Sequence, residues 1–425
     1  MIRVVIVGAG ARGNRVFADL ISRYQTGFHL AGVVEPVPVR RAAFEQRFGI
    51  PADRGFSSLA EFLAAPRFAD IVFICTLDPT HYAICAAVSE AGYDVLLEKP
   101  IATSLPDCLA LVAAERRIKN RIFVAHGLRY APFFRQIKRI IDSGEYGAAR
   151  HIAIREDVGH WHFAHSYVRG NWRRTADCAP IVLTKCSHDL DIASWLAGDR
   201  VASVSSVGSL SFFRPDNAPQ GATDRCLDCP HQHDCLYSAT RFYLRPETGW
   251  PFDTIVPPPD SVDARREALA TGPYGRCVWR CDNDVCDNQS VLIEFASGIH
   301  ATVSMNALTA DCTRKVTVLL DKAEITGDLY RDQLRVSPFT GDPYQLADRL
   351  IELPSAEDRH GGGDLGLLRA LGEHLESGKH GEIMSSLESS ILSHVLAFLA
   401  EDSRLAGGAR LPVSDAFVPE PFMGE

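Results

Sequence analysis

The chain has 425 residues, 46% of them hydrophobic and 23% charged, and its formal net charge is −9 at pH 7. This composition is typical of a soluble globular protein, and the length suits two domains. The acidic balance argues against a nucleic-acid partner, because phosphate binding needs a concentrated basic surface. No run reaches the roughly 18 consecutive apolar residues of a membrane helix. The N-terminus lacks the layout of a signal peptide, so we expect a cytoplasmic protein without a membrane partner.

Residues 1–126 alternate short apolar runs with helical patterns. The expected strands are residues 4–7, 30–34, 71–75, 95–97 and 122–125, and the expected helices are residues 12–23, 42–48, 81–91 and 105–119. Strands that alternate with helices at this spacing predict a doubly wound parallel sheet, the Rossmann arrangement. We therefore expect an N-terminal α/β domain over residues 1–126.

The rhythm changes over residues 127–363. The expected helices are residues 137–141 and 189–196, and the expected strands are residues 151–157, 201–213, 290–295, 300–305, 316–320 and 323–326. Ser297-Gly298 between two of these strands is a strong hairpin signal. The pattern predicts an α+β domain with a large open, mostly antiparallel sheet.

Two stretches interrupt this domain. Residues 214–289 have little periodicity, many prolines and a cysteine cluster, so we expect an insertion there. Residues 338–363 are rich in Pro, Gly and Asp and predict a surface loop. Two helices, at about residues 364–377 and 385–406, are expected to pack back on the body as a C-terminal part that covers residues 364–425.

A glycine motif, Gly8-Ala9-Gly10-Ala11-Arg12-Gly13, follows the first strand and opens the first helix. The first glycine permits a tight turn, and the second lets the backbone approach a pyrophosphate at the helix N-terminus. Glu35 ends the next strand, where a carboxylate can bind the adenosine ribose and repel a 2′-phosphate, which favours NAD. Arg40 and Arg41 lie close behind and leave NADP open. The residues expected to hold the dinucleotide here are Gly8, Gly10, Ala11, Arg12, Gly13, Glu35 and Arg40.

Two further motifs follow strands of the same sheet. Glu98-Lys99-Pro100 follows the fourth strand, and Thr76-Leu77-Asp78-Pro79-Thr80-His81 follows the third. The carboxyl ends of strands line the ligand crevice of a doubly wound sheet, so the Lys99 ammonium can reach a substrate near the nicotinamide. Pro100 fixes the chain direction there, with a cis bond as one option.

These motifs and the layout resemble the glucose–fructose oxidoreductase / inositol dehydrogenase / MocA family over nearly the whole chain. The resemblance implies that Lys99 is the catalytic lysine and lies along the cofactor together with Thr76, His81 and Glu98. It also implies a C-terminal α/β domain whose open sheet packs in oligomers. We therefore expect a homodimer or a homotetramer.

The second signature of this family is G-x-x-x-D-x-x-x-H-x-x-D, and residues 183–191 match it only in part. His188 matches the catalytic histidine and Asp191 the second carboxylate. Thr184 replaces the first aspartate, which normally orients the histidine. Two explanations stay open: Lys185 points into the pocket and binds the substrate, or Asp189 or Asp191 orients His188.

The chemistry of these residues suits an alcohol oxidation. A histidine near neutrality can accept the hydroxyl proton, and a lysine can stabilise the developing alkoxide. Residues 126–130 and 160–173 add aromatic faces for a sugar ring and arginines for an anionic group. His160, His162 and His165 could also suggest a metal, although no acidic partner is near. The residues expected to be catalytic are Lys99, His188 and Lys185, and those expected to bind substrate are Arg129, Tyr130, His165, Arg169, Trp172, Lys185 and His188.

The sequence thus predicts an NAD(P)-dependent oxidoreductase acting on a secondary hydroxyl of a sugar, inositol or sugar-acid-like substrate. An NAD-dependent glycosidase, which oxidises its substrate transiently, would use the same Lys99 and His188. A non-catalytic NAD-binding regulator is a second alternative, and reduction of a keto-sugar or imine is a third. Net formation of NADH separates the dehydrogenase from the glycosidase.

Six of the 12 cysteines lie within residues 226–286. In a reducing compartment such clustering favours a metal site over disulfides. The C-x-x-C turn of Cys226 and Cys229, with Cys235 and Cys277, predicts a structural zinc site that orders the insertion. The other candidate ligands are Cys281, His231 and His233.

Overall fold

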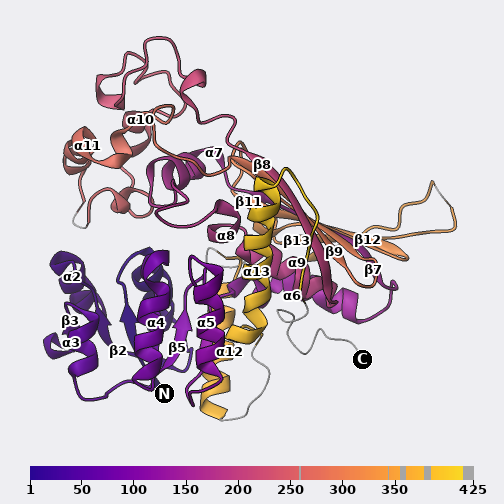
Figure 1. The fold of residues 1–425 in the computed structure, drawn as a ribbon, viewed down its shortest axis with the longest axis horizontal. Coiled ribbons are helices and arrows are strands. Elements are labelled where there is room, and N and C mark those ends of the chain that lie inside the picture. Colours follow the sequence, from indigo (N-terminus) through magenta and orange to yellow (C-terminus); the bar gives the residue numbers. More distant parts are fainter. Residues whose placement is uncertain (258–259, 343, 355–359, 378–383, 415–425) are drawn as a thin grey trace.

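The computed structural model describes residues 1–257, 260–342, 344–354, 360–377 and 384–414. Two parts, each built on its own β-sheet, lie side by side, and the insertion lies above the N-terminal part (Figure 1). The predicted fold class, a parallel Rossmann sheet followed by a mostly antiparallel open sheet, is confirmed.

The N-terminal sheet has six parallel strands in the order β3-β2-β1-β4-β5-β6. Residues Val4–Val7 and Ile71–Ile74 are buried along their whole length, because helices cover both faces of this sheet. The strands are β1 (Ile2–Val7), β2 (Phe28–Val34), β3 (Gly55–Phe56), β4 (Ile71–Ile74), β5 (Asp94–Leu97) and β6 (Ile122–Val124). The helices are α1 (Asp19–Arg23), α2 (Pro38–Phe48), α3 (Leu59–Ala64), α4 (His81–Glu90) and α5 (Leu105–Glu115), with a π-helical segment Gly13–Ala18 before α1.

The second sheet has the strand order β14-β13-β12-β11-β7-β10-β9-β8-β15. Within the described residues its neighbours are antiparallel, except for the parallel pair of β7 and β10. The strands are β7 (Ala149–Asp157), β8 (Val201–Ser209), β9 (Asn288–Phe295), β10 (His300–Asn306), β11 (Thr313–Leu320), β12 (Ala323–Asp328), β13 (Gln333–Pro338), β14 (Arg349–Glu352) and β15 (Leu411–Pro412).

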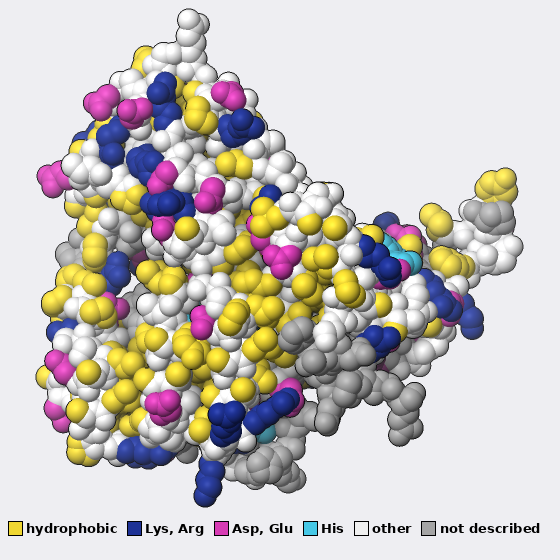
Figure 2. Space-filling model, in the orientation of Figure 1, with side chains coloured by type: hydrophobic (Ala, Val, Ile, Leu, Met, Phe, Trp, Pro, Cys, Tyr) yellow, Lys and Arg dark blue, Asp and Glu magenta, His cyan; other side chains and the backbone are white. Residues whose placement is uncertain are grey.

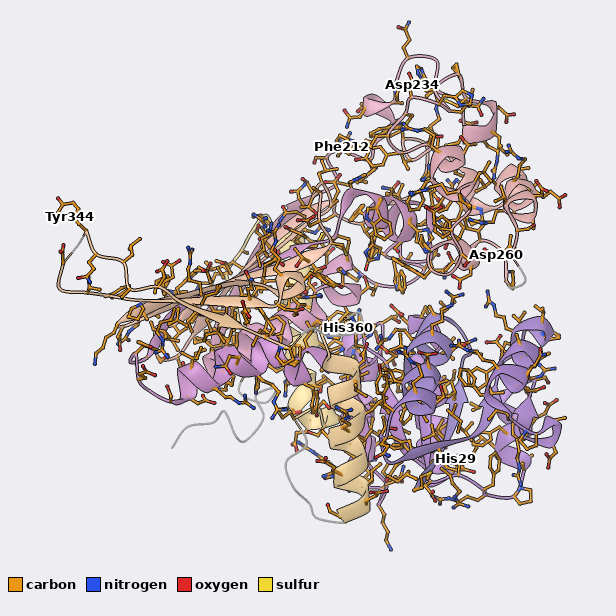
Figure 3. All side chains as sticks on the ribbon, turned by 180° about the vertical axis from the view of Figure 1, so that it is seen from behind. His29, Phe212, Asp234, Asp260, Tyr344 and His360 are labelled. Atoms are coloured by element: carbon orange, nitrogen blue, oxygen red, sulfur yellow. The ribbon has the colours of Figure 1, made fainter. Side chains whose placement is uncertain are left out.

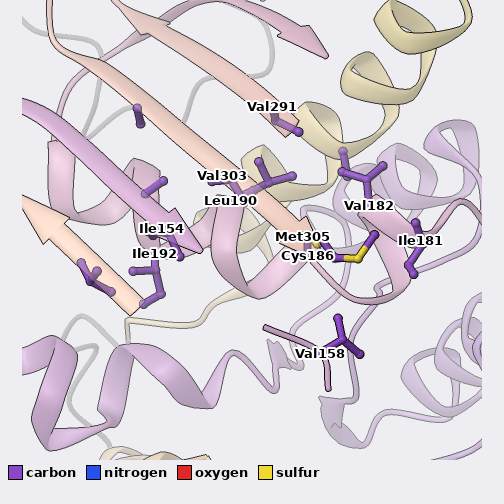
Figure 4. Packing of buried hydrophobic residues seen from close by; sticks show 14 of the residues in the cluster. Ile154, Val158, Ile181, Val182, Cys186, Leu190, Ile192, Val291, Val303 and Met305 are labelled. Atoms are coloured by element: carbon purple, nitrogen blue, oxygen red, sulfur yellow. The ribbon is translucent and has the colours of Figure 1, made fainter. Parts of the chain in front are cut away.

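Helices cover one face of this sheet, and the burial pattern of its strands identifies the covered face. Val291 and Ile293 of β9 are buried, whereas Leu292 between them is exposed, as expected for strands with one covered face. On the covered face, Leu190 and the neighbouring apolar residues of α9 (Ser187–Ala197) pack against β7 and β10 (Figure 4). This packing fixes α9, which carries His188. The other helices of this part are α6 (Pro132–Asp142), α7 (His160–Phe163) and α8 (Ile181–Thr184).

The two C-terminal helices join the parts. Leu367 and Leu371 of α12 (Gly363–Ser377) belong to the same buried cluster as Val4 and Phe73, so α12 completes the core of the N-terminal sheet. The longer α13 (Leu387–Leu405) contributes residues to the core clusters of both parts. The chain end therefore holds the two sheets in a fixed relation, which positions the site between them.

The insertion carries more structure than its composition predicts. It contains α10 (Ala239–Tyr243) and α11 (Val262–Thr271), with a small apolar core that includes Tyr243, Phe252 and Leu269. Asp253 forms an ion pair with Arg15, next to the glycine motif of the N-terminal part. The surface is hollowed where these two parts approach each other (Figure 2).

Two element predictions are wrong. The strand expected over residues 201–213 ends at Ser209, because the Asp287 carboxylate accepts hydrogen bonds from the backbone of Ser211 and Phe212 and turns the chain. The loop expected over residues 338–363 includes β14, which pairs with β13 and extends the sheet at one edge.

Candidate functional site

The glycine turn after β1 is tightly packed at two positions and open at a third. Gly8 has φ +94°, and a Cβ there would lie 2.8 Å from the carbonyl oxygen of Cys75. A Cβ at Gly13 would lie 2.1 Å from the oxygen of Gly8. At Gly10 a Cβ would meet nothing within 4 Å, so this backbone has room for an approaching ligand.

Glu35 lies at the end of β2 and faces this turn. Its buried carboxylate accepts hydrogen bonds from the backbone N–H of Ala9 and of Val37, both at 2.9 Å. These bonds fix the acidic group beside the turn, where the ribose contact was predicted. The Arg41 guanidinium donates to the backbone oxygen of Glu35 at 2.7 Å, and Arg40 is half-buried.

The loops after β4 and β5 are tied together by His81. Its Nδ1 lies 2.6 Å from the carbonyl oxygen of Pro100, and its Nε2 lies 3.2 Å from that of Thr76. The Lys99–Pro100 bond is cis. Because both ring nitrogens contact backbone and the ring is fully buried, the contacts of His81 hold the lysine loop in place.

Arg12 is the centre of an ion-pair cluster. Its Nε donates to Glu98 at 2.5 Å, and its two Nη atoms each donate to one oxygen of Asp364 at 2.9 Å. The pairing holds the pKa of Arg12 above its usual value in spite of burial, and Arg12 and His360 hold the pKa of the buried Asp364 below its usual value. The cluster joins the glycine motif, the Glu98-Lys99-Pro100 loop and α12. Asp364 was not among the residues predicted from the sequence.

Lys99 reaches from the N-terminal part to the second part. Its Nζ donates to the carbonyl oxygen of Thr184 at 2.5 Å. Burial lowers the pKa of Lys99, and Lys185 nearby also lowers it. Thr184 is the position where the family signature has an aspartate, and its backbone, rather than a carboxylate, receives the ammonium.

His188 is in the first turn of α9 and lies among other histidines. The ring centroids of His126 and His360 each lie 5.4 Å from that of His188, in edge-to-face arrangements. Burial lowers the pKa of His188, and Lys99 lowers it further. Its Nδ1 is buried and has no hydrogen-bond partner among the described residues.

The explanation that Asp189 or Asp191 orients His188 is wrong. Asp189 accepts a hydrogen bond from Arg314 Nε at 2.7 Å. Asp191 receives two hydrogen bonds from Arg129, at 2.7 and 2.6 Å. Both carboxylates point to arginines because α9 places each beside a buried guanidinium that needs a counter-charge.

Lys185 belongs to a second buried network. Its Nζ lies 2.8 Å from Glu156 Oε1, and Arg314 Nη2 lies 2.9 Å from Glu156 Oε2. Burial opposes ionisation of Glu156, but Arg314 and Lys185 outweigh it and hold its pKa below the usual value. The same pairing raises the pKa of Lys185. Lys185 is thus a charged ammonium already bonded to a carboxylate.

The other residues expected at the substrate separate into two groups. Arg129 and Tyr130 are buried and contact the start of α13: Arg129 donates to the oxygens of Met384 and Ser389, and Tyr130 shares a hydrogen bond with Ser385 at 2.9 Å. These contacts fix the start of α13 against the loop after β6.

The second group lies toward the insertion. Trp172 Nε1 donates to Asp78 of the N-terminal part at 2.9 Å. His165 lies 2.9 Å from the Tyr243 hydroxyl, and Arg169 donates to the oxygens of Arg276 and Tyr237. His165 and Arg169 therefore contact the base of the insertion.

The four cysteines expected to bind zinc line one cavity in the insertion, beside His231 and Trp279. Across the described residues no group of three or more His, Cys, Asp or Glu side chains is arranged to hold a metal ion. Each of the cysteines is a free thiol. The four cavity-lining cysteines are Cys226, Cys229, Cys235 and Cys277.

Two family models match the chain. The model "Oxidoreductase family, NAD-binding Rossmann fold" matches residues 2–126, and the model "GFO/IDH/MocA C-terminal domain" matches residues 134–227. No helix within the described residues is long and apolar enough to cross a membrane.

Several known proteins are similar to the chain. The putative oxidoreductase YteT of Bacillus subtilis is 24% identical over 388 residues, which cover 87% of this chain and 88% of YteT. Inositol 2-dehydrogenase of Corynebacterium glutamicum is 28% identical over 207 residues, 48% of this chain and 56% of that enzyme, so this match spans about half of each.

Solved structures share the fold. Levoglucosan dehydrogenase in complex with NADH and levoglucosan superposes with a TM-score of 0.72 at 16% identity, covering 97% of this chain and 100% of that one. An oxidoreductase from Agrobacterium radiobacter in complex with NAD+, L-tartaric acid and magnesium gives a TM-score of 0.68 at 17% identity, covering 97% and 98%.

The network of Lys185, Glu156 and Arg314 predicts a pH-dependent stability. Glu156→Gln should lower the free energy of unfolding by about 3–5 kcal/mol at pH 7, because it leaves buried cations short of a counter-charge. The folded-state pKa of Glu156 is depressed, so its contribution is complete above the unfolded value of about 4.3 and is lost as pH falls through the folded value. Denaturant unfolding should therefore show a difference in the free energy of unfolding between variant and wild type, and this difference should become smaller below about pH 4.

Glu352→Gln, an exposed carboxylate on β14, is the matched control and should change stability by less than about 0.5 kcal/mol. The assigned network would be contradicted if Glu156→Gln lowered the free energy of unfolding no more than this control does. A difference from wild type that does not depend on pH would also contradict it.

Proposed function

The chain belongs to the GFO/IDH/MocA family of NAD-binding oxidoreductases, and on that premise we propose that it is a dehydrogenase of polyhydroxylated substrates. The hydride passes between a secondary hydroxyl carbon of a sugar, inositol or sugar acid and the nicotinamide. The observation that carries this proposal is the position of Lys99, which projects from the carboxyl end of β5 to the helix pair that bears His188.

The residues around the glycine turn fit a dinucleotide. Gly10 leaves open space at the start of the helical segment, where backbone N–H groups can meet a pyrophosphate. The Glu35 carboxylate is fixed beside this turn and retains lone pairs for the adenosine ribose. A 2′-phosphate would be repelled there, so NAD is the proposed cofactor. When bound, NAD supplies the hydride acceptor of the oxidation.

The chain's own residues supply the polar chemistry of the reaction. The Lys99 ammonium can donate a hydrogen bond to the reacting oxygen and stabilise the negative charge that develops on it. Since burial lowers the pKa of Lys99, this group can also release its proton more readily than an exposed lysine. His188 is held neutral by burial, so it meets the substrate as a hydrogen-bonding ring rather than as a cation.

The names of similar proteins support the proposed substrate class. Proteins similar to this chain are named for inositol and for levoglucosan, and one is a complex with L-tartaric acid. Arg314 acts on the pKa of His188 and, like Lys185, is paired with the Glu156 carboxylate, so charged groups are held in fixed positions on this side of the site. Such a surface suits a ligand with several hydroxyl groups.

The test of the proposed function is cofactor turnover. Inositols, aldoses and sugar acids are incubated with NAD or NADP, and reduced cofactor is followed by absorbance. We expect one substrate class to give NADH in step with product, with NAD preferred. Release of an aglycone with no net NADH would indicate a glycosidase, and binding of NAD without turnover on any substrate would indicate a regulator; either result contradicts the proposal.

Lys99→Ala should lower kcat/KM by about 10²–10³-fold with NAD affinity little changed, because the ammonium acts on the reacting oxygen. Lys119→Ala, an exposed lysine of the same domain, is the control and should leave the rate unchanged. Turnover of Lys99→Ala within a few-fold of wild type would remove the lysine from the mechanism.

We also propose that the four-cysteine cavity takes a structural zinc ion. Arg169 is fully buried beside it, with one Nη 3.6 Å from the Sγ of Cys226, and its other hydrogen bonds go to the carbonyl oxygens of Arg276 and Tyr237. No carboxylate of the described chain balances this guanidinium, and a buried unbalanced charge is costly. Thiolates of Cys226 and its three neighbours, held by zinc, would supply the missing negative charge.

Metal analysis of protein purified without chelator should show about one zinc per chain. Cys229→Ser should lower metal content and, for a loss of roughly 2 kcal/mol, the thermal midpoint by about 2–3 °C. Cys286→Ser, a buried cysteine of the insertion that does not line the cavity, should keep its metal. Metal-free protein of full stability would end this proposal.

The open face of the second sheet is the proposed contact between subunits. Val207, Leu292 and Leu319 are 61%, 46% and 38% exposed on strands β8, β9 and β11. An uncovered sheet face with apolar side chains is typical of an interface. Light scattering at micromolar concentration should give the mass of a dimer or tetramer. Leu292→Arg should lower this mass toward that of the monomer. A monomeric wild-type mass would refute the assignment.

A further inference from the structure

The segment that opens α12 brings a second histidine to the site. Gly361 and Gly362 have φ of +60° and +86°, values that side-chain-bearing residues rarely adopt. A Cβ at Gly363 would lie 2.4 Å from the carbonyl oxygen of Gly127. The glycines therefore let the backbone pack against the loop after β6 and place His360 at the boundary of the two parts, just before the first residue of α12 (Figure 3).

His360 has a carboxylate partner, which Nδ1 of His188 lacks within the described part of the chain. Its Nδ1 lies 2.9 Å from Oδ2 of Asp364, which is four residues later, in the first turn of α12. Asp364 is fully buried, and its two oxygens also receive the Arg12 guanidinium, so the carboxylate cannot rotate away. The ring of His360 packs edge-to-face on that of His188. A carboxylate-oriented histidine thus lies next to the position where the family signature would build one.

We infer that His360, oriented by Asp364, is the group that takes the proton of the reacting hydroxyl, in place of the histidine–aspartate pair that Thr184 breaks on α9. The inference rests on the proposed dehydrogenase function. The His360 side chain is 23% exposed, whereas His188 is 3% exposed. His360 can therefore pass a proton to solvent, and the buried His188 has no such path.

The step balances as a simple alcohol oxidation. The carbinol carbon loses a hydride with its bonding pair to NAD, and the oxygen forms the carbonyl double bond. The hydroxyl proton bonds to Nε2 of His360, while the proton on Nδ1 stays in the hydrogen bond to Asp364. The resulting imidazolium is stabilised by the carboxylate and passes its proton to water.

Several charged or titratable groups surround His360. Asp364 faces it from α12, with Arg12 behind that carboxylate. His188 faces it from α9, and beyond His188 lie His126 and Lys99. Among the groups named here Asp364 is the one hydrogen-bonded to the ring, so the loss of its charge should change proton transfer.

The test is the pH dependence of kcat/KM in wild type, His360→Gln, His188→Gln and Asp364→Asn. His360→Gln should lower kcat/KM by about 10²–10⁴-fold and remove the fall in rate at acidic pH, because glutamine cannot take the proton. Asp364→Asn should lower the rate and displace the acidic limb. His374→Gln, on α12 like Asp364, is the control and should match wild type. His360→Gln with a normal rate and an intact acidic limb, beside an inactive His188→Gln, would overturn the inference in favour of His188.

A second measurement does not need turnover. In ¹⁵N-histidine-labelled protein, neutral His360 should carry its proton on Nδ1 and have an unprotonated Nε2, and Asp364→Asn should change this tautomer balance. A proton fixed on Nε2 in wild type would overturn the inference, because that nitrogen could not then accept one. Absence of turnover in wild type on every substrate would instead count against the proposed function, and the tautomer would then decide the role of His360 by itself.

Discussion

The ion pairs of Arg12 with Asp364 and Glu98 are the contacts on which the rest of the site depends. They join three segments that are far apart in sequence: the helix after the glycine motif, the loop after β5 and the first turn of α12. The Arg12 side chain is 27% exposed, whereas Glu98 is largely buried and Asp364 fully buried. Loss of the guanidinium would therefore leave two buried carboxylates without their counter-charge. One arginine thereby sets the distance between the cofactor turn, the Lys99 loop and His360.

The chemistry of the site follows from this arrangement. Lys99 and His81 are fixed through the backbone of their loops, and Lys99 reaches across to Thr184, so the lysine joins the two parts as well as serving the reaction. Around His188 the chain buries two balanced networks, one through Glu156 and Arg314 and one through Asp191 and Arg129. Because every carboxylate of α9 already has an arginine, the oriented histidine comes from another element. The contact of Asp253 with Arg15 brings the insertion to the same region.

The sequence predicted what depends on local pattern. The parallel sheet, the glycine turn and Glu35 follow from apolar runs and from residues within one βαβ unit, and the strand ends place Lys99 and Thr76 on one edge. It did not predict Asp364 or His360, because their partners Arg12 and His188 lie more than 150 residues away and no spacing rule connects them. The spacing of His360 and Asp364 was visible, but His360 lay in the expected loop and Asp364 at the first residue of the expected helix, so no shared helical face indicated a pair. Glu156 and Arg314 were missed for the same reason: they pair across neighbouring strands whose register only the folded sheet defines.

The most direct measurement is a crystal structure of the chain with NAD and a bound polyol. The account predicts the pyrophosphate at Gly10, the adenosine ribose on Glu35, and the nicotinamide beside Lys99, with Arg12 still bonded to Asp364 and Glu98. The reacting hydroxyl should lie within hydrogen-bond distance of Lys99 Nζ and of His360. A cofactor that displaces Arg12 from Asp364, or a substrate bound away from Lys99, would contradict the account.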